Sequence, residues 1–300
     1  MSTVEPLHII FTMDCHPAAT KGAPEGPKSW EQSVRAIDGF CNVVRDAGYP
    51  ITLFFTPESA QMHAPFVDEL LSTNMEVGLY IQPPSLSGTR YRQFLGQYAD
   101  VDQQEIVLLA MQRFRDAVGV RPQSVRSAMF SASDRTFGTL YNLGFRQGSL
   151  SNPGRRVNKH SAVWTGAARD AHYVRPDSRL EPGDLPFFEV PITTDADQEH
   201  GGLAPDLMLE HGSFEKWQRP LIDGQLQRME ATGIPFKALC LGTRNCFAYH
   251  NRSDPARQTL DAVLAHLETF AESREGHLAY ELYPTTVSGA HRLYRTAMLG

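Results

Sequence analysis

The sequence predicts an α/β protein with a parallel sheet that closes into a barrel of seven or eight strands. Short apolar runs rich in β-branched residues alternate with segments of helical spacing through most of the 300 residues. No proline-, serine- or glycine-rich linker divides the chain, so residues 1–300 are expected to form one domain. Hydrophobic residues make up 41% of the chain and charged residues 21%, which is enough apolar material for a sizeable core.

The individual elements follow from these two periodicities. Apolar runs predict strands at residues 7–13, 51–55, 75–81, 123–126, 187–192, 237–241 and 278–282. Helical spacing predicts helices at about 29–47, 59–73, 102–118, 134–143, 213–232 and 255–271. The first helix ends before Gly48, a residue type that is common just past helix C-termini. The stretch from Gly148 to Pro186 has little periodicity and predicts a long loop that is functional or is ordered by a substrate.

Charge and composition exclude several classes of function. The net charge is −6 and the arginines are scattered, so no nucleic-acid partner is expected. The N-terminal residues lack the basic region of a signal peptide, and no apolar stretch approaches the roughly 18 residues that span a bilayer. We therefore expect a cytoplasmic protein without a membrane partner. The four cysteines form no C-x-x-C pair and are expected to be reduced thiols.

Polar side chains occur where several of the predicted strands end. Asp14 and His16 follow the first strand, Tyr80 and Gln82 end the third, and Arg126 ends the strand at 123–126. In a (β/α) barrel the carboxyl ends of the strands share one face, and reactive groups gather there. Each residue alone is also typical of a cap or turn. Their coincidence favours a site on that face.

Four segments resemble the polysaccharide deacetylases, the NodB-homology or carbohydrate esterase superfamily. They are F-T-M-D-C-H-P (11–17), F-F-T-P-E-S-A-Q-M-H-A-P-F-V-D-E-L-L (54–71), R-P-Q-S-V-R-S-A-M-F-S-A-S-D-R-T-F-G-T-L-Y-N-L-G-F (121–145) and L-C-L-G-T-R-N-C-F-A-Y-H-N-R (239–252). The resemblance runs from about residue 7 to about residue 285 and implies a distorted (β/α) barrel. In that family one carboxylate is the base toward a metal-bound water, a second carboxylate and two histidines hold the metal, and a late histidine protonates the leaving amine.

Carried over to this chain, the resemblance implies Asp14 as the base, Arg126 as the residue that orients it, and His250 as the acid. The place of the metal carboxylate falls on His16, or on Cys15 if the two acids of the family motif are adjacent. By alternation along the strand, Cys15 is expected to point away from its neighbours and to pack in the core.

The family's two metal-binding histidines are replaced in the stretch E-V-G-L-Y-I-Q-P-P (76–84). Their places fall on Tyr80 and Gln82, or on Tyr80 and Pro84 under a longer spacing. Tyrosine binds divalent ions only when it is deprotonated, and a neutral amide oxygen is a weak zinc ligand. Two expectations stay open: a site that works without a metal, and a site where His16 helps to hold a weakly bound divalent ion such as zinc, cobalt or manganese.

Substrate contacts are expected from two places. Tyr80 and Gln82 share one face of their strand and are predicted to hydrogen-bond a sugar or an amide, or simply to fill the vacated pocket. Trp164 and His172, in the long segment, are predicted to line the same site or to anchor that segment. The acidic stretch D-A-D-Q-E-H (195–200) lacks the glycine and terminal glutamate of a calcium loop and predicts a solvated turn.

Two hypotheses of different classes follow. The first is a hydrolase of a carbon–nitrogen amide bond other than a peptide bond, in an N-acetylated sugar or a small amide, because some members of the resembled superfamily hydrolyse small cyclic amides without a metal. The second is a catalytically inactive barrel that binds a carbohydrate or has a regulatory role. The presence of Asp14, Arg126 and His250 favours the first hypothesis, and the missing histidine pair favours the second.

Overall fold

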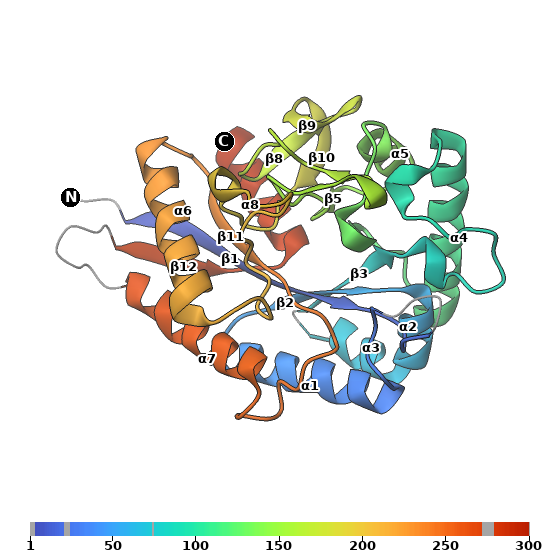
Figure 1. The fold of residues 1–300 in the computed structure, drawn as a ribbon, viewed down its shortest axis with the longest axis horizontal. Helices are drawn as coiled ribbons and strands as arrows, with labels where there is room; N and C mark the ends of the chain where they lie inside the picture. Colours follow the sequence, from blue (N-terminus) through green and yellow to red (C-terminus); the bar gives the residue numbers. More distant parts are fainter. Residues whose placement is uncertain (1–3, 21–24, 74, 272–278, 300) are drawn as a thin grey trace.

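A twisted, mostly parallel sheet surrounded by helices forms the body of the protein (Figure 1). The computed structural model describes residues 4–20, 25–73, 75–271 and 279–299. The strands of the large sheet lie in the order β11-β1-β2-β3-β4-β5-β10-β8-β9, and β12 pairs with β1. Their bounds are β1 (Glu5–Cys15), β2 (Ile51–Phe55), β3 (Glu76–Ile81), β4 (Ser124–Ser127), β5 (Gln147–Gly148), β8 (His172–Arg175), β9 (Ser178–Pro182), β10 (Leu185–Glu189), β11 (Lys237–Leu241) and β12 (Tyr280–Pro284).

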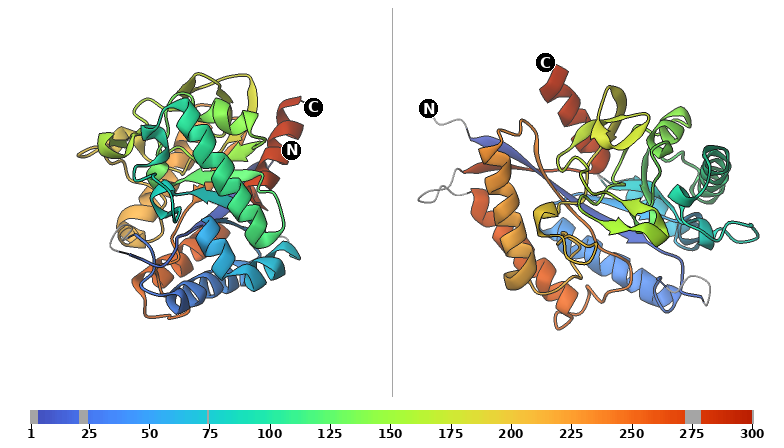
Figure 2. Two further views of the ribbon diagram at one scale, coloured as in Figure 1. Left: turned by 90° about the vertical axis from the view of Figure 1, so that its right-hand side faces the viewer. Right: turned by 45° about the horizontal axis from the view of Figure 1, so that its top comes forward.

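The helices lie on the outside of the sheet, as the views of Figure 2 show. They are α1 (Trp30–Asp46), α2 (Pro57–Met62), α3 (Ala64–Leu71), α4 (Asp100–Val118), α5 (Thr136–Asn142), α6 (Arg219–Ala231), α7 (Pro255–Glu268) and α8 (Val287–Leu299). Single helical turns occur at Pro83–Ser85, Leu95–Gln97, Ala128–Phe130, Asn158–His160, Ala196–Gln198, Phe214–Gln218 and Thr269–Ala271. Within the described ranges, no helix combines the length and the apolar character needed to cross a lipid bilayer.

β1 is the strand around which the sheet is built. Every residue from Leu7 to Cys15 is buried, so neither face of this part of the strand is open to solvent. Its amino-terminal part lies between β11 and β12, and its carboxyl-terminal part pairs with β2. The alternation predicted from the sequence therefore produces the expected α/β fold, and Cys15 is buried in its core as expected.

The ladder of strands does not close into a regular barrel. Beyond β10 the chain continues to Thr193, whose amide donates to the carbonyl of Cys240 in β11 at 3.1 Å. A second segment joins the same edge, where the amide of Leu209 donates to the carbonyl of Gly242 at 2.9 Å. Irregular chain thus bridges the gap between β10 and β11, which agrees with the distorted barrel that the sequence resemblance implies.

The predicted long loop at 148–186 is wrong, because this stretch contains four strands. β8 and β9 form an antiparallel hairpin that extends the sheet beyond β10, and β6 (Arg156–Val157) pairs with β7 (Ala162–Val163). β9 is half-buried to exposed along its whole length. Its sequence therefore lacks the alternation of apolar and polar residues that identifies a strand.

Smaller differences have local causes. The helix predicted at 59–73 is interrupted at His63, because Pro65, which has no amide hydrogen, starts a new helix. The helix predicted at 213–232 begins with a wider turn, and its regular part starts at Arg219 beside a second proline. The strand predicted at 278–282 is observed as β12, although residue 278 itself lies outside the described residues. α8 was not expected from the sequence.

Candidate active site at the carboxyl ends of the strands

A buried ion pair connects β1 to β4. Arg126 donates through Nη1 to Asp14 Oδ1 at 2.9 Å and to Thr12 Oγ1 at 2.9 Å. The other side of the guanidinium donates to the carbonyl and the hydroxyl of Ser149, at 2.9 and 2.7 Å. The Arg126 side chain is fully buried and that of Asp14 is 5% exposed. The pair therefore fixes the carboxylate and leaves its Oδ2 without a partner among the described residues.

His16 lies beside this carboxylate with an unsatisfied ring. Its backbone is held on both sides by Asn245, whose side chain accepts from the His16 amide and donates to the His16 carbonyl, both at 2.9 Å. Neither ring nitrogen has a hydrogen-bond partner within the described ranges, although both are buried. Burial lowers the pKa of His16 to about 4 against the opposing charge of Asp14, so the imidazole is neutral at pH 7.

Tyr80 and Gln82 complete the group from β3. The ring of Tyr80 meets the ring of His16 edge to face at 4.9 Å, and Tyr80 is the register partner of Arg126 in the sheet. Burial raises the pKa of Tyr80 well above its ordinary value, so the phenol stays a hydrogen-bond donor. The amide oxygen of Gln82 is buried without a partner among the described residues. Buried polar atoms are rarely unpaired in proteins, so these atoms identify where a polar ligand or water belongs.

These side chains do not match the donor set of a zinc, cobalt or manganese centre. Among the described residues there is no group of three or more His, Cys, Asp or Glu side chains that could hold a metal ion. The nearest donors are one carboxylate already paired with Arg126, the imidazole of His16 and the amide of Gln82. A protonated phenol such as Tyr80 is not a ligand. We therefore derive no step through a metal.

Arg244 belongs to the site and was missed from the sequence. It follows β11, forms an isolated parallel bridge with Asp14, and donates through Nε to Glu210 Oε1 at 2.8 Å. The Glu210 side chain is 2% exposed. The charge of Arg244 contributes to the lowered pKa of His16, after burial. Arg244 lies three residues past a strand end, in a turn with no periodic pattern, so no sequence signal identified it.

A histidine–aspartate pair lies next to Arg244 on the same edge. His211 Nδ1 is 2.8 Å from Asp206 Oδ1, and Asn152 donates to the other carboxylate oxygen at 2.9 Å. Asp206 is nearly buried, whereas the His211 side chain is 55% exposed. The hydrogen bond to Asp206 raises the pKa of His211 above its ordinary value. The sequence D-L-M-L-E-H at 206–211 places three ionisable residues close together, but it matches no motif that would identify a site.

His250, the acid implied by the sequence resemblance, is placed elsewhere. Its side chain is exposed and lines a surface hollow together with residues of α1 and α7. Its backbone packs against Gly39 of α1, where a β-carbon would come within 2.5 Å of the His250 amide nitrogen. No hydrogen bond, ion pair or ring contact of the described residues joins His250 to Asp14.

Among the described residues, no hydrogen bond or ring contact joins Trp164 or His172 directly to Asp14, His16, Tyr80 or Gln82. Trp164 is fully buried, and its indole N–H donates to the carbonyl of Phe130 at 2.8 Å. His172 lies on β8, where its Nδ1 is 2.8 Å from the carbonyl of Asp170. Of the two alternatives open from the sequence, these contacts favour anchoring of the 148–186 segment over contact with a substrate.

Comparison with solved structures identifies the fold. A protein from Mycobacterium smegmatis, assigned as a polysaccharide deacetylase, superposes with a TM-score of 0.63 at 13% identity, covering 99% of this chain and 92% of the other. The Puue allantoinase gives a TM-score of 0.60 at 14% identity, with 99% and 93% covered. A protein of Pseudomonas aeruginosa PAO1 with the same deacetylase assignment gives 0.60 at 12% identity, with 97% and 91% covered.

Comparison of the sequence with protein-family models and with curated proteins found no match. At the identities of the structural matches, the likeness shows a shared fold and leaves the activity to be argued from the site itself. The α/β fold expected from the sequence is confirmed at this level, because it is shared with these two deacetylase structures and the allantoinase structure.

Proposed function

We propose that the protein hydrolyses a carbon–nitrogen amide bond other than a peptide bond, in an N-acylated sugar or a small amide, with Asp14 as the base. One observation carries this proposal. A carboxylate fixed by the buried Arg126 keeps one free oxygen beside the unpartnered buried atoms of His16 and Gln82. A fixed base next to unsatisfied polar groups is what proton abstraction from a bound water requires.

The reaction assigns one task to each group. Asp14 Oδ2 takes a proton from water, and the water oxygen attacks the carbonyl carbon of the amide. The protonated phenol of Tyr80 donates toward the carbonyl oxygen as negative charge develops on it. The C–N bond then breaks, and the leaving nitrogen takes a proton from His211. The products are a carboxylic acid and an amine, and Arg126 acts as a positioning residue.

His211 takes the role of acid in place of His250 for two reasons. Its hydrogen bond to Asp206 raises its pKa, which keeps more of the imidazole protonated near pH 7. It also lies beside Arg244, which borders Asp14, and the His211 ring is accessible from solvent. His250 lies outside this group of residues, in the surface hollow beside α1 and α7.

The test compares the turnover of the wild type and of the Asp14→Asn variant, with N-acetylated sugar oligomers and small cyclic amides as substrates. We expect turnover to fall by roughly 10²–10⁴-fold, as for loss of a general base. Asp116→Asn, an exposed carboxylate on α4, is the matched control and should retain full activity. Full turnover by Asp14→Asn would refute the mechanism.

A second variant covers the case in which Asp14→Asn does not fold, because it leaves Arg126 buried without its counter-charge. His211→Gln changes a half-exposed side chain and should fold normally. We expect a lower kcat with little change in KM. Wild-type activity should decline as pH rises through the raised pKa of His211, and the variant should lack this decline. Identical pH profiles would remove His211 from the mechanism.

Removal of metal ions tests, independently of the variants, whether the reaction needs a metal. Because no group of three strong ligands occurs among the described residues, activity is expected to survive dialysis against a chelator. Loss of activity on chelation, with recovery on adding zinc, cobalt or manganese, would contradict a metal-free reaction and favour a weak ion at His16.

The second candidate is a barrel that binds a carbohydrate without hydrolysing it. The lack of a metal-ligand cluster among the described residues is the observation that favours it. It predicts sugar binding with no turnover by the wild type, and only a modest change in affinity for Asp14→Asn.

The protein is also proposed to be cytoplasmic. All four cysteines are free thiols, which is usual for proteins in a reducing compartment.

A further inference from the structure

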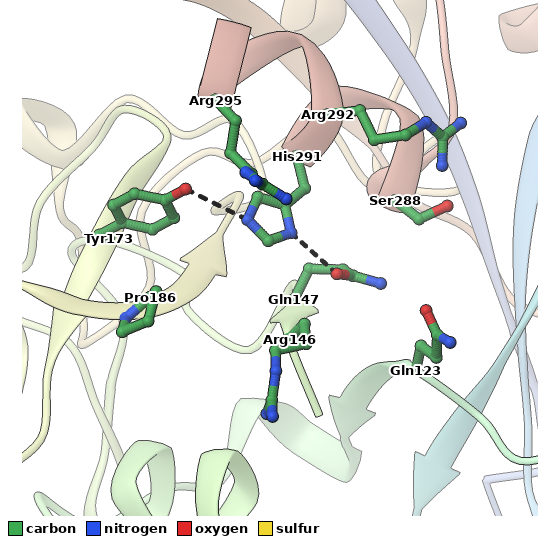
Figure 3. Close-up of a pocket in the computed structure, with 9 residues that line it drawn as sticks. All are labelled: Gln123, Arg146, Gln147, Tyr173, Pro186, Ser288, His291, Arg292 and Arg295. Atoms are coloured by element: carbon green, nitrogen blue, oxygen red, sulfur yellow. Dashed lines mark hydrogen bonds between the residues drawn. The ribbon is translucent and has the colours of Figure 1, made fainter. Parts of the chain in front are cut away.

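A pocket lies at the amino-terminal ends of the strands, whereas Asp14 lies at a carboxyl end. It has a volume of about 570 Å³ and is formed by the residues that begin β4, β5 and β10, together with Tyr173 of β8 and one side of α8 (Figure 3). Asp14 and Gln82, by contrast, lie at the carboxyl ends of β1 and β3. The volume is within the range of small-molecule sites.

The charge of this pocket is positive. Arg146, Arg292 and Arg295 line it, and none of its lining residues is an aspartate or glutamate. Within the described part of the chain, Arg292 and Arg295 form no ion pair with a carboxylate. Arg146 lies over the ring of Tyr141 at 4.4 Å and donates to backbone carbonyls, so its charge also has no carboxylate partner there. The three arginines therefore give the pocket a positive charge that no lining carboxylate offsets.

The floor of the pocket is a hydrogen-bond chain whose direction is fixed. Ser124 donates to the carboxylate of Glu76, so the Ser124 oxygen accepts from Gln147 Nε2 at 2.9 Å. The Gln147 oxygen therefore faces His291 Nδ1, 2.9 Å away, and that nitrogen carries the hydrogen. His291 Nε2 then accepts from the hydroxyl of Tyr173 at 3.3 Å, as Figure 3 shows.

These hydrogen bonds hold the side chains at the floor of the pocket in place, and the side chains that line the pocket there are uncharged. Burial, and after it the charges of Arg295 and Arg292, lower the pKa of His291 to about 4, so the ring carries no charge at pH 7. The Glu76 carboxylate accepts from the Thr52 hydroxyl and from the amide of Ser288, at 3.0 and 2.9 Å. Its charge is bound by these donors at the amino end of α8, so it does not pair with the arginines.

We propose that this pocket binds a phosphorylated small molecule, whose phosphate contacts Arg292 and Arg295 and whose hydroxyl groups contact Gln147 and Tyr173. A phosphate monoester carries a charge of about −2 near pH 7, which matches two unpaired guanidinium groups. The planar guanidinium binds phosphate oxygens in pairs. Pro186 and the ring of Tyr173 supply apolar walls for an organic body. The proposal is independent of the hydrolase activity.

The test is titration calorimetry of the full chain with glucose 6-phosphate and with AMP. Glucose, adenosine and inorganic phosphate separate the contributions of the organic body and the phosphate. We expect binding of at least one phosphorylated probe, weakened by added salt. In the double variant Arg292→Gln/Arg295→Gln the Kd should rise about tenfold or more. Arg115→Gln, an exposed arginine on α4, is the matched control and should bind as the wild type does.

Three outcomes would overturn the proposal. The first is that neither glucose 6-phosphate nor AMP binds. Another is unchanged affinity in the double variant, with thermal melting confirming that both proteins are folded. The third is inorganic phosphate binding as tightly as the organic phosphates, since the pocket would then hold a free anion and not a phosphorylated small molecule. None of these outcomes depends on the fate of Asp14.

Discussion

Glu189 is a buried carboxyl group with only one of its two oxygens hydrogen-bonded among the described residues. Its side chain lies at the end of β10 and is fully buried. Oε1 accepts from the amides of Leu150 and Ser151 and from the Ser151 hydroxyl, at 2.7, 2.8 and 2.9 Å. Oε2 has no partner within the described ranges. Burial raises the pKa of Glu189 to about 7 even against these three donors.

The raised pKa predicts a stability that falls as pH rises. Between the ordinary glutamate value of about 4.5 and the folded value of about 7, the folded protein binds a proton that the unfolded chain releases. The stabilisation is complete below pH 4.5 and is lost as pH passes 7. Glu189→Gln is neutral throughout, so the difference in unfolding free energy between wild type and variant should change by on the order of 3 kcal/mol across this window.

Urea unfolding of both proteins at pH 4.5, 6 and 8 measures that difference, and other titrating groups cancel in the comparison. A difference that is the same at all three pH values would show that Glu189 is ionised throughout, held by its three donors. Ser151→Ala, which removes one donor and leaves the carboxyl group, should raise the pKa further and steepen the wild-type trend.

The site residues that the sequence could identify are those at the ends of regular strands. Asp14, Tyr80 and Arg126 follow from strand periodicity alone, because parallel strands bring their carboxyl ends to one edge. Arg244 and His211 could not be found in this way. They lie in irregular segments that join the sheet through isolated bridges and loop hydrogen bonds, which leave no periodic pattern in the sequence.

At the scale of elements, the turn after β4 contains the most strained backbone near the site. Met129 and Phe130 have φ values of 59° and 57°, in the left-handed region that residues other than glycine rarely adopt. The turn directly follows β4, which carries Arg126, and the guanidinium lies 5.8 Å from the centre of the Phe130 ring. The indole N–H of Trp164 donates to the carbonyl of Phe130, so the 148–186 segment holds this turn in place.

Trp164→Phe tests that link, because it keeps an aromatic ring and removes the donor. The buried carbonyl of Phe130 would lose its partner, which costs about 1–3 kcal/mol of unfolding free energy. Turnover should also fall if the turn positions Arg126. Trp217→Phe, at a tryptophan that is 43% exposed, is the control and should change stability by less than about 0.5 kcal/mol. Equal effects of the two substitutions, measured by urea unfolding, would remove the proposed link.

The 148–186 segment shows which kind of strand cannot be predicted from the sequence. Strands such as β2 and β11 are buried on both faces and are visible as apolar runs. β8 is only four residues long and pairs with β10, while β9 pairs with β8 alone and forms the edge of the sheet with half-buried to exposed side chains. Information of that kind resides in the tertiary structure, so the 148–186 stretch could only be expected to be a loop.

At the scale of the whole molecule, the two ends of the chain meet at β1. β12, near the C-terminus, pairs with Glu5–Ile9, while β11 pairs with Leu7–Phe11 on the other side. A chain that ends at residue 271 would lack β12 and α8. The amino-terminal half of β1 would then have an uncovered edge of unpaired backbone groups beside fully buried side chains such as Leu7.

We expect this truncated chain to lose cooperative unfolding, because a domain of ordinary stability has only about 5–15 kcal/mol to lose. Loss of the β1–β12 ladder leaves backbone groups unpaired and exposes apolar side chains of β1, and both effects lower the stability. A chain that ends at residue 286 keeps β12 and removes only α8. It should fold with lower stability, and the difference between the two truncations measures the contribution of β12. Far-ultraviolet circular dichroism through a urea titration distinguishes the cases, and cooperative unfolding of the chain that ends at 271 would show that β1 does not need its C-terminal neighbour.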